Sequence, residues 1–377
     1  MTLEVTIHDT FKTVPADEWE NLWKRTPQAH VYQTWCWYAT WARHFAKPGC
    51  IRVLLVHDGG RLVGSAPLYI YTQSFYGFFR RKVLTFLSSY SPVYPLDQGP
   101  LIEVEALDKV LATLADRIIK LRGFDVISFE LFAPESPTHL LIEELAHRCG
   151  RRVDYRACAT SHVVELAPAY EDFISTLGST TRKNIRKYSN RFFAEEGRKI
   201  KIVSLPEEML ELLEALCTQK QRRFKCMGRK STFDNDRFIA FLKDVCTTFL
   251  HDGRVLGLMA LVDGKIAATQ LILLDQHGHC FAYNSSYDLD FTDMRLHYVL
   301  ENARFEAAIQ KGYQQMDLSS GFNHHKEHWS RGNTRDLLEG TLVMRPLGNT
   351  SFWLLGQIKA VLKPDKNSPD ETSLPNK

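Results

Sequence analysis

An internal repeat is the feature that most constrains the fold of this chain of 377 residues. Residues 51–71 and 254–274 each hold two apolar runs separated by a turn with Asp and Gly, a strong hairpin signal. After each hairpin come a helical stretch, a glycine–aromatic pair and a strand. These segments are 105–122, 123–124 and 125–131 in the first instance, and 293–311, 312–313 and 314–320 in the second. The repeat predicts two copies of one mixed α/β unit.

The predicted copies cover residues 1–166 and 167–348, a division that the length of the chain also favours. The stretch "SHVVEL" (161–166) is interpreted as the closing strand of the first copy. Residues 349–377 are predicted to form an amphipathic helix followed by a polar, Pro-rich disordered tail. That helix is expected to dock on the second domain, with contact to a membrane surface as the alternative.

Composition excludes several classes of protein. The net charge of +3 gives no general case for binding nucleic acid, although a local patch stays possible. The eight cysteines form no C-x-x-C pair, so zinc-ribbon and redox motifs are unsupported and a reducing compartment is favoured. The N-terminus has no signal-peptide pattern, and no apolar run is long enough to span a membrane. These features predict a cytoplasmic protein.

Two segments are rich in one kind of side chain. The aromatic segment 32–45 places residues 34, 38, 41 and 45 at helical spacing, which favours core packing over a sugar-stacking platform. Residues 170–197 are predicted to be helical, apolar at first and then basic. The basic part forms either a solvated helix face or a grip for phosphate, an anionic glycan or RNA.

Four stretches, together with the order of elements, carry a family resemblance: "VYQTWCWYATWARHF" with "LVGSAPLYI", "TTRKNIRKYSNRF", "AYNSSYDLDFTDMRLHYVLENARFEAAIQKGYQQMDL" and "DLSSGFNHHKEHW". The order of elements resembles the GNAT acyltransferase fold, and its duplication resembles the tandem arrangement of the Fem-type transferases. The chain most resembles GNAT-like proteins associated with bacterial cellulose and exopolysaccharide biosynthesis. The fold class that this resemblance implies is α/β with a mixed sheet, in two tandem GNAT-like domains. The second domain would be active, and the first would be degenerate and structural.

The resemblance implies that an acyl-CoA such as acetyl-CoA lies where strand 280–287 separates from strand 314–320. An acceptor amine or hydroxyl would attack the thioester directly. The donor would contact Ser285, Met294, Arg295 and Leu296. Catalytic roles fall to Asp317 as base or orienting group, Lys326 as a counter-charge, and Tyr283 as the acid for the leaving thiolate. Acceptor contacts would come from Arg182, Arg186, Arg191, His324 and Trp329.

The acceptor that this resemblance implies is a precursor of the cell envelope or of an exopolysaccharide. One alternative is transfer of an aminoacyl group from charged tRNA, as in Fem-type enzymes. A second is a catalytically inactive binding subunit of polysaccharide biosynthesis.

The expected donor loop, residues 287–297, has no glycine and carries Asp288, Asp290 and Asp293. Carboxylates oppose a bound pyrophosphate unless a cation offsets them, and Arg295 or His297 is the expected counter-charge.

The histidines of "DLSSGFNHHKEHW" at first suggest a metal site. His324 and His328 are four residues apart, but Lys326 between them would repel a cation, and the order is not H-E-x-x-H. The prediction is therefore no metal. Each catalytic candidate also has a structural interpretation: Asp317 paired with an arginine, Lys326 as a surface lysine and Tyr283 as a core aromatic.

Overall fold

The computed structural model describes residues 3–345 except 76–78, 90–92, 94 and 321–323. The chain divides into two compact units. Unit 1 runs to Thr160 and resumes at Asp336, and unit 2 comprises Ser161–Ser320 and His324–Arg335. Both units combine helices with a mixed sheet, so the predicted α/β class is confirmed.

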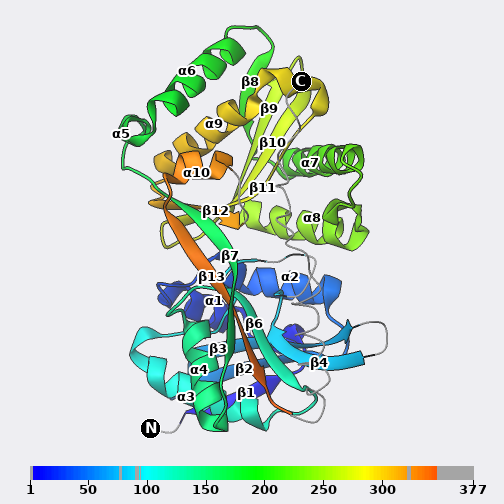
Figure 1. Cartoon of the computed structure of the whole chain (residues 1–377), viewed down its shortest axis with the longest axis vertical. Helices are drawn as coiled ribbons and strands as arrows, with labels where there is room; N and C mark the ends of the chain where they lie inside the picture. Colours follow the sequence, from blue (N-terminus) through cyan, green and yellow to red (C-terminus); the bar gives the residue numbers. More distant parts are fainter. Residues whose placement is uncertain (1–2, 76–78, 90–92, 94, 321–323, 346–377) are drawn as a thin grey trace, which may run out of the picture. The chain divides into compact units, whose positions relative to one another are not determined.

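Unit 1 has a sheet in the order β1-β2-β3-β4-β6-β13, with β5 beside β3 (Figure 1). Its strands are β1 (Glu4–His8), β2 (Ile51–Asp58), β3 (Arg61–Phe75), β4 (Phe79–Phe86), β5 (Leu101–Ile102), β6 (Val126–Phe132) and the later part of β13 (Thr334–Val343). Its helices are α1 (Ala16–Arg25), α2 (Trp35–Phe45), α3 (Leu107–Lys120) and α4 (Pro137–Cys149), with short 3-10 turns.

The aromatic segment of unit 1 lies in its interior. Trp37, Tyr38 and Trp41 of α2 are all 0% exposed, and the Trp41 ring packs edge-on against Tyr69 of β3. The predicted core role of this segment is therefore confirmed. A separate apolar cluster joins α3 and α4 to the sheet through residues such as Val110.

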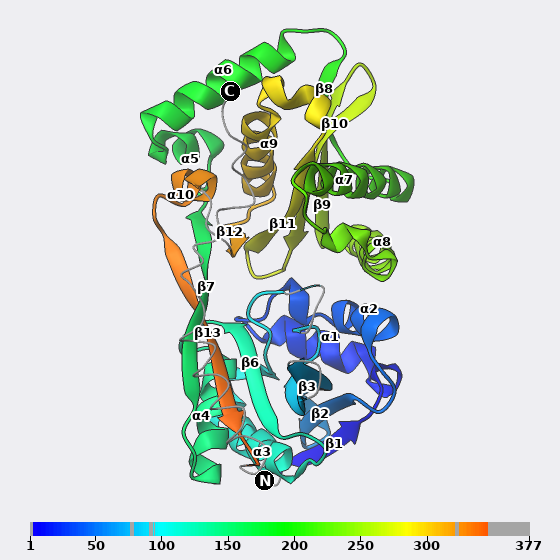
Figure 2. The same cartoon turned by 45° about the vertical axis from the view of Figure 1, so that its right-hand side comes forward.

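Unit 2 repeats this plan with the strand order β8-β9-β10-β11-β12-β7. Its strands are β8 (Arg198–Ile202), β9 (Val255–Val262), β10 (Lys265–Leu274), β11 (His279–Tyr287), β12 (Gln315–Ser320) and the later part of β7 (Asp154–Glu165). Its helices are α5 (Tyr170–Thr176), α6 (Ser179–Phe193), α7 (Pro206–Cys226), α8 (Asp236–His251), α9 (Leu296–Gln310) and α10 (His324–Ser330). In Figure 2, α9 lies on one face of the strands and α7 and α8 lie on the other.

The predicted repeat is confirmed at the level of elements. Both hairpins form, as β2–β3 and β9–β10, and Gly60 and Gly264 in their turns have positive φ angles of 82° and 78°. These are backbone conformations that glycine adopts at low cost. The helix and strand that follow each hairpin are α3 and β6 in unit 1 and α9 and β12 in unit 2.

The closing strands are exchanged between the copies, which the sequence did not predict. Residues 161–166 were expected to close the first copy, but Ser161–Glu165 of β7 pair with β12 of unit 2. The sheet of unit 1 is closed instead by Leu338–Val343 of β13, antiparallel to β6. Unit 1 therefore includes the described residues 336–345, which the predicted ranges placed in the second domain.

The predicted helix 170–197 is two helices, because the chain turns out of the helical conformation at Leu177 and Gly178. Leu177 has a ψ of 152°, and its side chain is buried in the core of unit 2. The predicted amphipathic helix and tail, 349–377, lie outside the described residues.

Candidate active site

The site starts where two neighbouring parallel strands of unit 2 separate. The described pairing of β11 with β12 runs from His279↔Gln315 to Phe281↔Asp317 and ends there, although both strands continue. Beyond this point Ser319 Oγ donates a hydrogen bond to the carbonyl of Ala282 at 2.9 Å. Separated strands leave main-chain groups available for a ligand. This is the separation that the resemblance implied.

A β-bulge lies beside the separation. On β10, Leu271 pairs with Asn284 and Ile272 pairs with Ala282, so Tyr283 is the extra residue of β11. Bulges re-aim side chains and interrupt strand pairing, and they are frequent next to active sites. Tyr283 is half-buried, and its hydroxyl oxygen is shielded from solvent.

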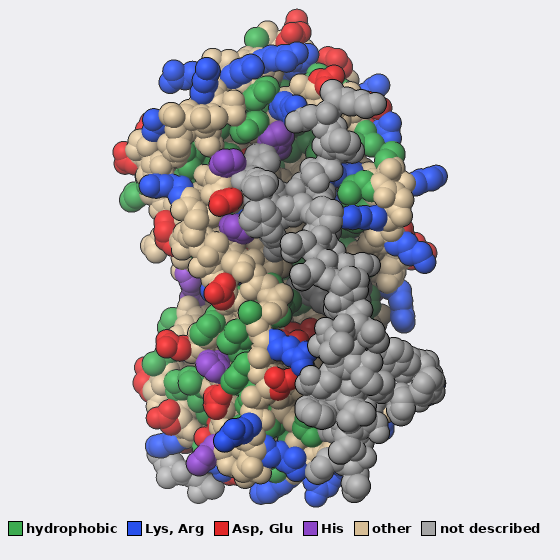
Figure 3. Space-filling view, in the orientation of Figure 1, with side chains coloured by type: hydrophobic (Ala, Val, Ile, Leu, Met, Phe, Trp, Pro, Cys, Tyr) green, Lys and Arg blue, Asp and Glu red, His purple; other side chains and the backbone are tan. Residues whose placement is uncertain are grey.

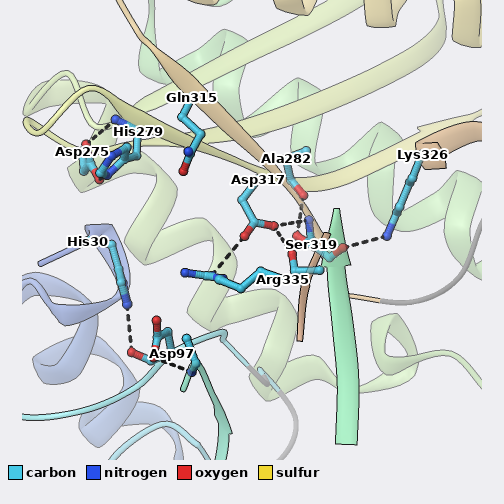
Figure 4. A network of polar contacts seen from close by, with 12 residues as sticks. His30, Asp97, Asp275, His279, Ala282, Gln315, Asp317, Ser319, Lys326 and Arg335 are labelled. Atoms are coloured by element: carbon cyan, nitrogen blue, oxygen red, sulfur yellow. Dashed lines mark hydrogen bonds and ion pairs between the residues drawn. The ribbon is translucent and has the colours of Figure 1, made fainter. Parts of the chain in front are cut away.

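Asp317 lies at the last position where β12 pairs with β11 and is only 5% exposed. Its carboxylate accepts hydrogen bonds from the Ser161 hydroxyl, from Ser319 N–H at 2.7 Å and from Arg335 Nη2 at 3.2 Å (Figure 4). The carboxylate holds Ser319 with a positive φ of 66° at the end of the strand. Because the carboxylate already accepts from these three donors, Asp317 is better suited to orienting neighbouring groups and pairing with Arg335 than to abstracting a proton.

Lys326 of α10 reaches back to the end of the same strand. Its Nζ donates to the carbonyls of Ser319 at 3.2 Å and Ser320 at 2.8 Å (Figure 4). The network of Asp317 and Lys326 thus fixes both the amide and the carbonyl of Ser319. It places a positive charge beside the separated strands.

The other predicted residues of this segment differ in their surroundings. Trp329 is 2% exposed and packs against Phe305 of α9 with ring centroids 4.7 Å apart, so its position is that of a core residue and not of an acceptor contact. His324 begins α10, but its side chain lies outside the described residues.

Two carboxylates of the expected donor loop, 287–297, pair with a helix that the sequence did not implicate. Arg222 of α7 donates to Asp288 and Asp290, each at 2.7 Å. The hydrogen bond from Arg222 lowers the pKa of Asp290. The cation paired with Asp288 and Asp290 is therefore Arg222, whereas the sequence suggested Arg295 or His297. Arg222 precedes Asp288 by 66 residues and Asp290 by 68, so the local sequence pattern does not reveal these pairs.

The N-terminus of α9 follows this loop. Its N-cap residue, Arg295, has a left-handed φ of 51° and makes no side-chain cap, and the first turn holds no acidic residue. Such an end presents main-chain N–H groups and the positive end of the helix dipole to an anion. Arg295 and Ser285 are exposed, whereas Leu296 is buried and Met294 packs against the core.

His162 of β7 is a member of this region that the sequence did not identify. It is 5% exposed, and its Nδ1 lies 3.2 Å from Ser330 Oγ. Burial, together with the nearby Lys326 ammonium, lowers the pKa of His162, so the ring is neutral at neutral pH. It was missed because its strand was assigned to the other copy.

The predicted arginines Arg182, Arg186 and Arg191 lie on the exposed side of α6. Among the described contacts, no hydrogen bond or ion pair joins them to Asp317 or Lys326. The structure therefore groups Asp317, Lys326 and Tyr283 near the strand separation and leaves the α6 arginines as a separate surface.

The described residues contain no group of three or more His, Cys, Asp or Glu side chains arranged to hold a metal ion. No described helix has the length and apolar character needed to cross a bilayer.

Comparison with known proteins supports the fold. Residues 179–327 match the acetyltransferase (GNAT) domain, from the start of α6 into α10. The chain is similar to the crystal structure of FemX, with a TM-score of 0.61 and 11% identity, over 93% of this chain and 99% of that one. No curated protein sequence matches it.

Two further structures have similar folds. A conserved protein of unknown function from Bacteroides thetaiotaomicron gives a TM-score of 0.54 at 12% identity, over 90% of this chain and 100% of that one. The C-terminal domain of a putative lysylphosphatidylglycerol synthetase from Agrobacterium fabrum gives 0.52 at 10% identity, over 92% and 95%. At these identities the likeness concerns the fold, so the chain has a FemX-like fold in which residues 179–327 match a GNAT acetyltransferase domain.

Proposed function

We propose that unit 2 transfers an acyl group from acyl-CoA to an amine or hydroxyl of a cell-envelope or exopolysaccharide precursor. The observation that carries this proposal is the separation of β11 from β12, next to the uncapped N-terminus of α9. The separated strands offer main-chain donors to a thioester carbonyl, and the helix end offers a place for the diphosphate. The match to an acetyltransferase domain over the same residues supports this proposal.

The chemistry is a direct displacement. The acceptor nitrogen or oxygen forms a bond to the thioester carbon, the carbon–sulfur bond breaks, and the acceptor passes its proton to water. Main-chain N–H groups near the Tyr283 bulge would stabilise the oxygen that becomes negative in the transition state. The Tyr283 hydroxyl would protonate the leaving thiolate. Asp317 and Lys326 would hold the end of β12 in the conformation that this requires.

In the described part of unit 1, the segment leading into α3 carries carboxylates, which supports one active unit. The residues before α3 include Glu103, which is 4% exposed and paired with Arg25 and Arg61 at 2.5 Å each. Asp108 stands in the first turn of α3. Carboxylates at a helix N-terminus take the place that a phosphate would occupy. The first domain is therefore proposed to be structural.

Titration calorimetry with acetyl-CoA tests the proposal. We expect micromolar binding, weakened about tenfold or more by Arg295→Glu, which puts a carboxylate at the N-terminus of α9. Arg331→Glu is the matched control, since Arg331 is also exposed and has a positive φ of 55°. Equal effects of the two substitutions, or turnover of acyl-CoA that survives Asp317→Ala and Lys326→Ala unchanged, would contradict the site assignment.

A second candidate donor is an aminoacyl-tRNA. Two observations favour it: the fold is similar to that of FemX, and the loop before α9 has no glycine to let phosphates approach the backbone closely. Absence of binding to any CoA ester, together with binding of charged tRNA that falls steeply with salt, would select this donor. Binding of neither would favour an inactive subunit of polysaccharide biosynthesis.

A further inference from the structure

Helix α6 presents an exposed side that is entirely basic or neutral. At 100° per residue, its solvent-facing arc carries no acidic residue, and every charged side chain on the helix is positive. These cations are Arg182, Lys183, Arg186, Lys187 and Arg191, and each is exposed. Figure 3 shows a row of blue side chains over the position of α6.

The positive charges on this arc are not neutralised within the described part of unit 2. Arg182 donates to the main-chain carbonyl of Ser175 at 2.7 Å, and Lys187 lies over the ring of Tyr188. None of the described ion pairs includes a cation of α6, whereas the nearby Arg198 is paired with Glu195. An uncompensated row of like charges repels itself and attracts a polyanion.

An aromatic side chain lies on the same arc. Phe193, the last residue of α6, is 57% exposed. It follows Arg182 by eleven positions and Arg186 by seven, so all three point to one side of the helix. A bare phenyl ring among cations is unfavourable in water, and it is well suited to the boundary between lipid headgroups and acyl chains.

The helix is held rigidly, so this surface is preformed. Ile185 and Phe192 are buried in the core of unit 2 on the opposite side of α6. Asn184 donates to the Tyr298 hydroxyl of α9 at 3.0 Å, and the Tyr188 and Tyr298 rings stack 5.2 Å apart.

We propose that the exposed arc of α6 docks unit 2 on an anionic lipid bilayer. The cations would contact headgroup phosphates while Phe193 enters the interface. RNA fits the arc less well, because Phe193 offers a single exposed aromatic face and the two tyrosines beside the arc stack on each other. The inference concerns the exposed side of α6, whose other side packs against Tyr298 in the first turn of α9, and it holds whichever donor the enzyme uses.

Co-sedimentation of the whole protein with large unilamellar vesicles tests this directly. We expect binding to vesicles of phosphatidylcholine with about a third phosphatidylglycerol, weak binding to pure phosphatidylcholine, and loss of binding at high salt. Each cation is worth about fivefold in affinity, so the triple variant Arg182→Gln, Arg186→Gln, Arg191→Gln is expected to bind about a hundredfold more weakly.

The matched control removes the same charge elsewhere. Lys109, Arg151 and Arg152 of unit 1 are exposed, and their replacement by Gln is expected to change vesicle affinity less than fivefold. Phe193→Ser in the otherwise unchanged chain is expected to lower affinity several-fold and to leave the salt dependence intact. Circular dichroism and thermal denaturation show whether each variant is folded.

Three outcomes overturn the proposal. The first is equal loss of binding in the α6 triple variant and the control variant. The second is unchanged binding in the triple variant, which would assign any lipid contact to another part of the chain. The third is α6-dependent binding of a transfer-RNA-sized RNA without binding of anionic vesicles.

Discussion

At the scale of single residues, Asp317 shows how a buried carboxylate obtains the hydrogen-bond donors and the counter-charge that it needs. Its charge is balanced by Arg335, and its oxygens also accept from a hydroxyl and an amide. The sequence indicated Asp317 because a carboxylate after an apolar strand needs a partner. It did not identify Arg335 or Ser161, because the strand that lies beside β12 is decided by tertiary pairing and not by local pattern.

Asp317→Asn is expected to destabilise unit 2 by about 1–3 kcal/mol, since the amide leaves Arg335 without its counter-charge and loses an acceptor. Urea denaturation measures this free energy of unfolding. Asp336→Asn is the control, because Asp336 is exposed and bonds only the Thr160 hydroxyl at 3.3 Å. If both variants are equally stable, the Asp317 network does not stabilise the fold.

Two histidines of unit 2 should give stability opposite dependences on pH. The hydrogen bond to Asp275 raises the pKa of His279 above 6.5, so its stabilisation is full below pH 6.5 and is lost as pH rises through the folded pKa. Burial lowers the pKa of His162, so its contribution is full above pH 6.5 and is lost as pH falls below that value. We therefore expect His279→Gln to flatten the alkaline side of the profile and His162→Gln the acidic side.

Chemical denaturation at a series of pH values between about 5 and 8.5 measures these slopes. If the plot of unfolding free energy against pH keeps its wild-type shape in both variants, neither histidine governs the dependence of stability on pH.

At the scale of elements, regular pattern and turn chemistry were sufficient for most of the fold. Both hairpins, both helix-to-strand connections and the aromatic helix α2 follow from apolar spacing and from the Asp and Gly residues in the turns. The break between α5 and α6 was missed, because residues 170–197 keep a helical pattern and the turn at Leu177 serves burial of that side chain. The ion pairs of Asp288 and Asp290 were missed because their arginine comes from α7.

The contact of α3 with β3 is tight enough to be tested at one position. A Cβ atom at Gly64 would lie 2.3 Å from Val110 Cγ1, although the backbone of Gly64 does not require glycine. Gly64→Ala is expected to cost about 1–3 kcal/mol of stability through overpacking. Adding Val110→Ala should recover part of that cost, so the double variant should be more stable than the sum of the two single effects predicts. Strict additivity in denaturant titrations would contradict this packing.

At the scale of the whole molecule, the two copies share a strand order, but each is closed by a strand from the other part of the chain. β7 leaves unit 1 at Thr160 and ends on β12, and β13 leaves unit 2 at Arg335 and ends on β6. The sequence predicted the duplication but assigned residues 161–166 to the wrong copy. Both assignments satisfy the alternation of apolar residues, so only the three-dimensional pairing distinguishes them.

Ending the chain after residue 335 should therefore destabilise unit 1, although the rest of unit 1 comes from the N-terminal part of the sequence. The truncation removes Leu337 and Leu342, both 0% exposed, and leaves β6 without its antiparallel partner. We expect faster amide hydrogen exchange in β6 and unchanged protection in β10 and β11 of unit 2. A chain ending after residue 345 is the control, since it keeps β13 whole. Equal protection of β6 in the two chains would rule out this role for β13.

The exchanged strands also set an order of events during synthesis. The strands of unit 2 are all available once residue 335 has left the ribosome, whereas unit 1 lacks its last strand until residue 343 has emerged. The part of the protein that is made first is thus completed last, which reverses the usual order of N-terminal domains folding ahead of later ones. Until then the open edge of β6 is a strand edge on which a nascent chain can mispair, and chaperone contact is expected to concentrate there.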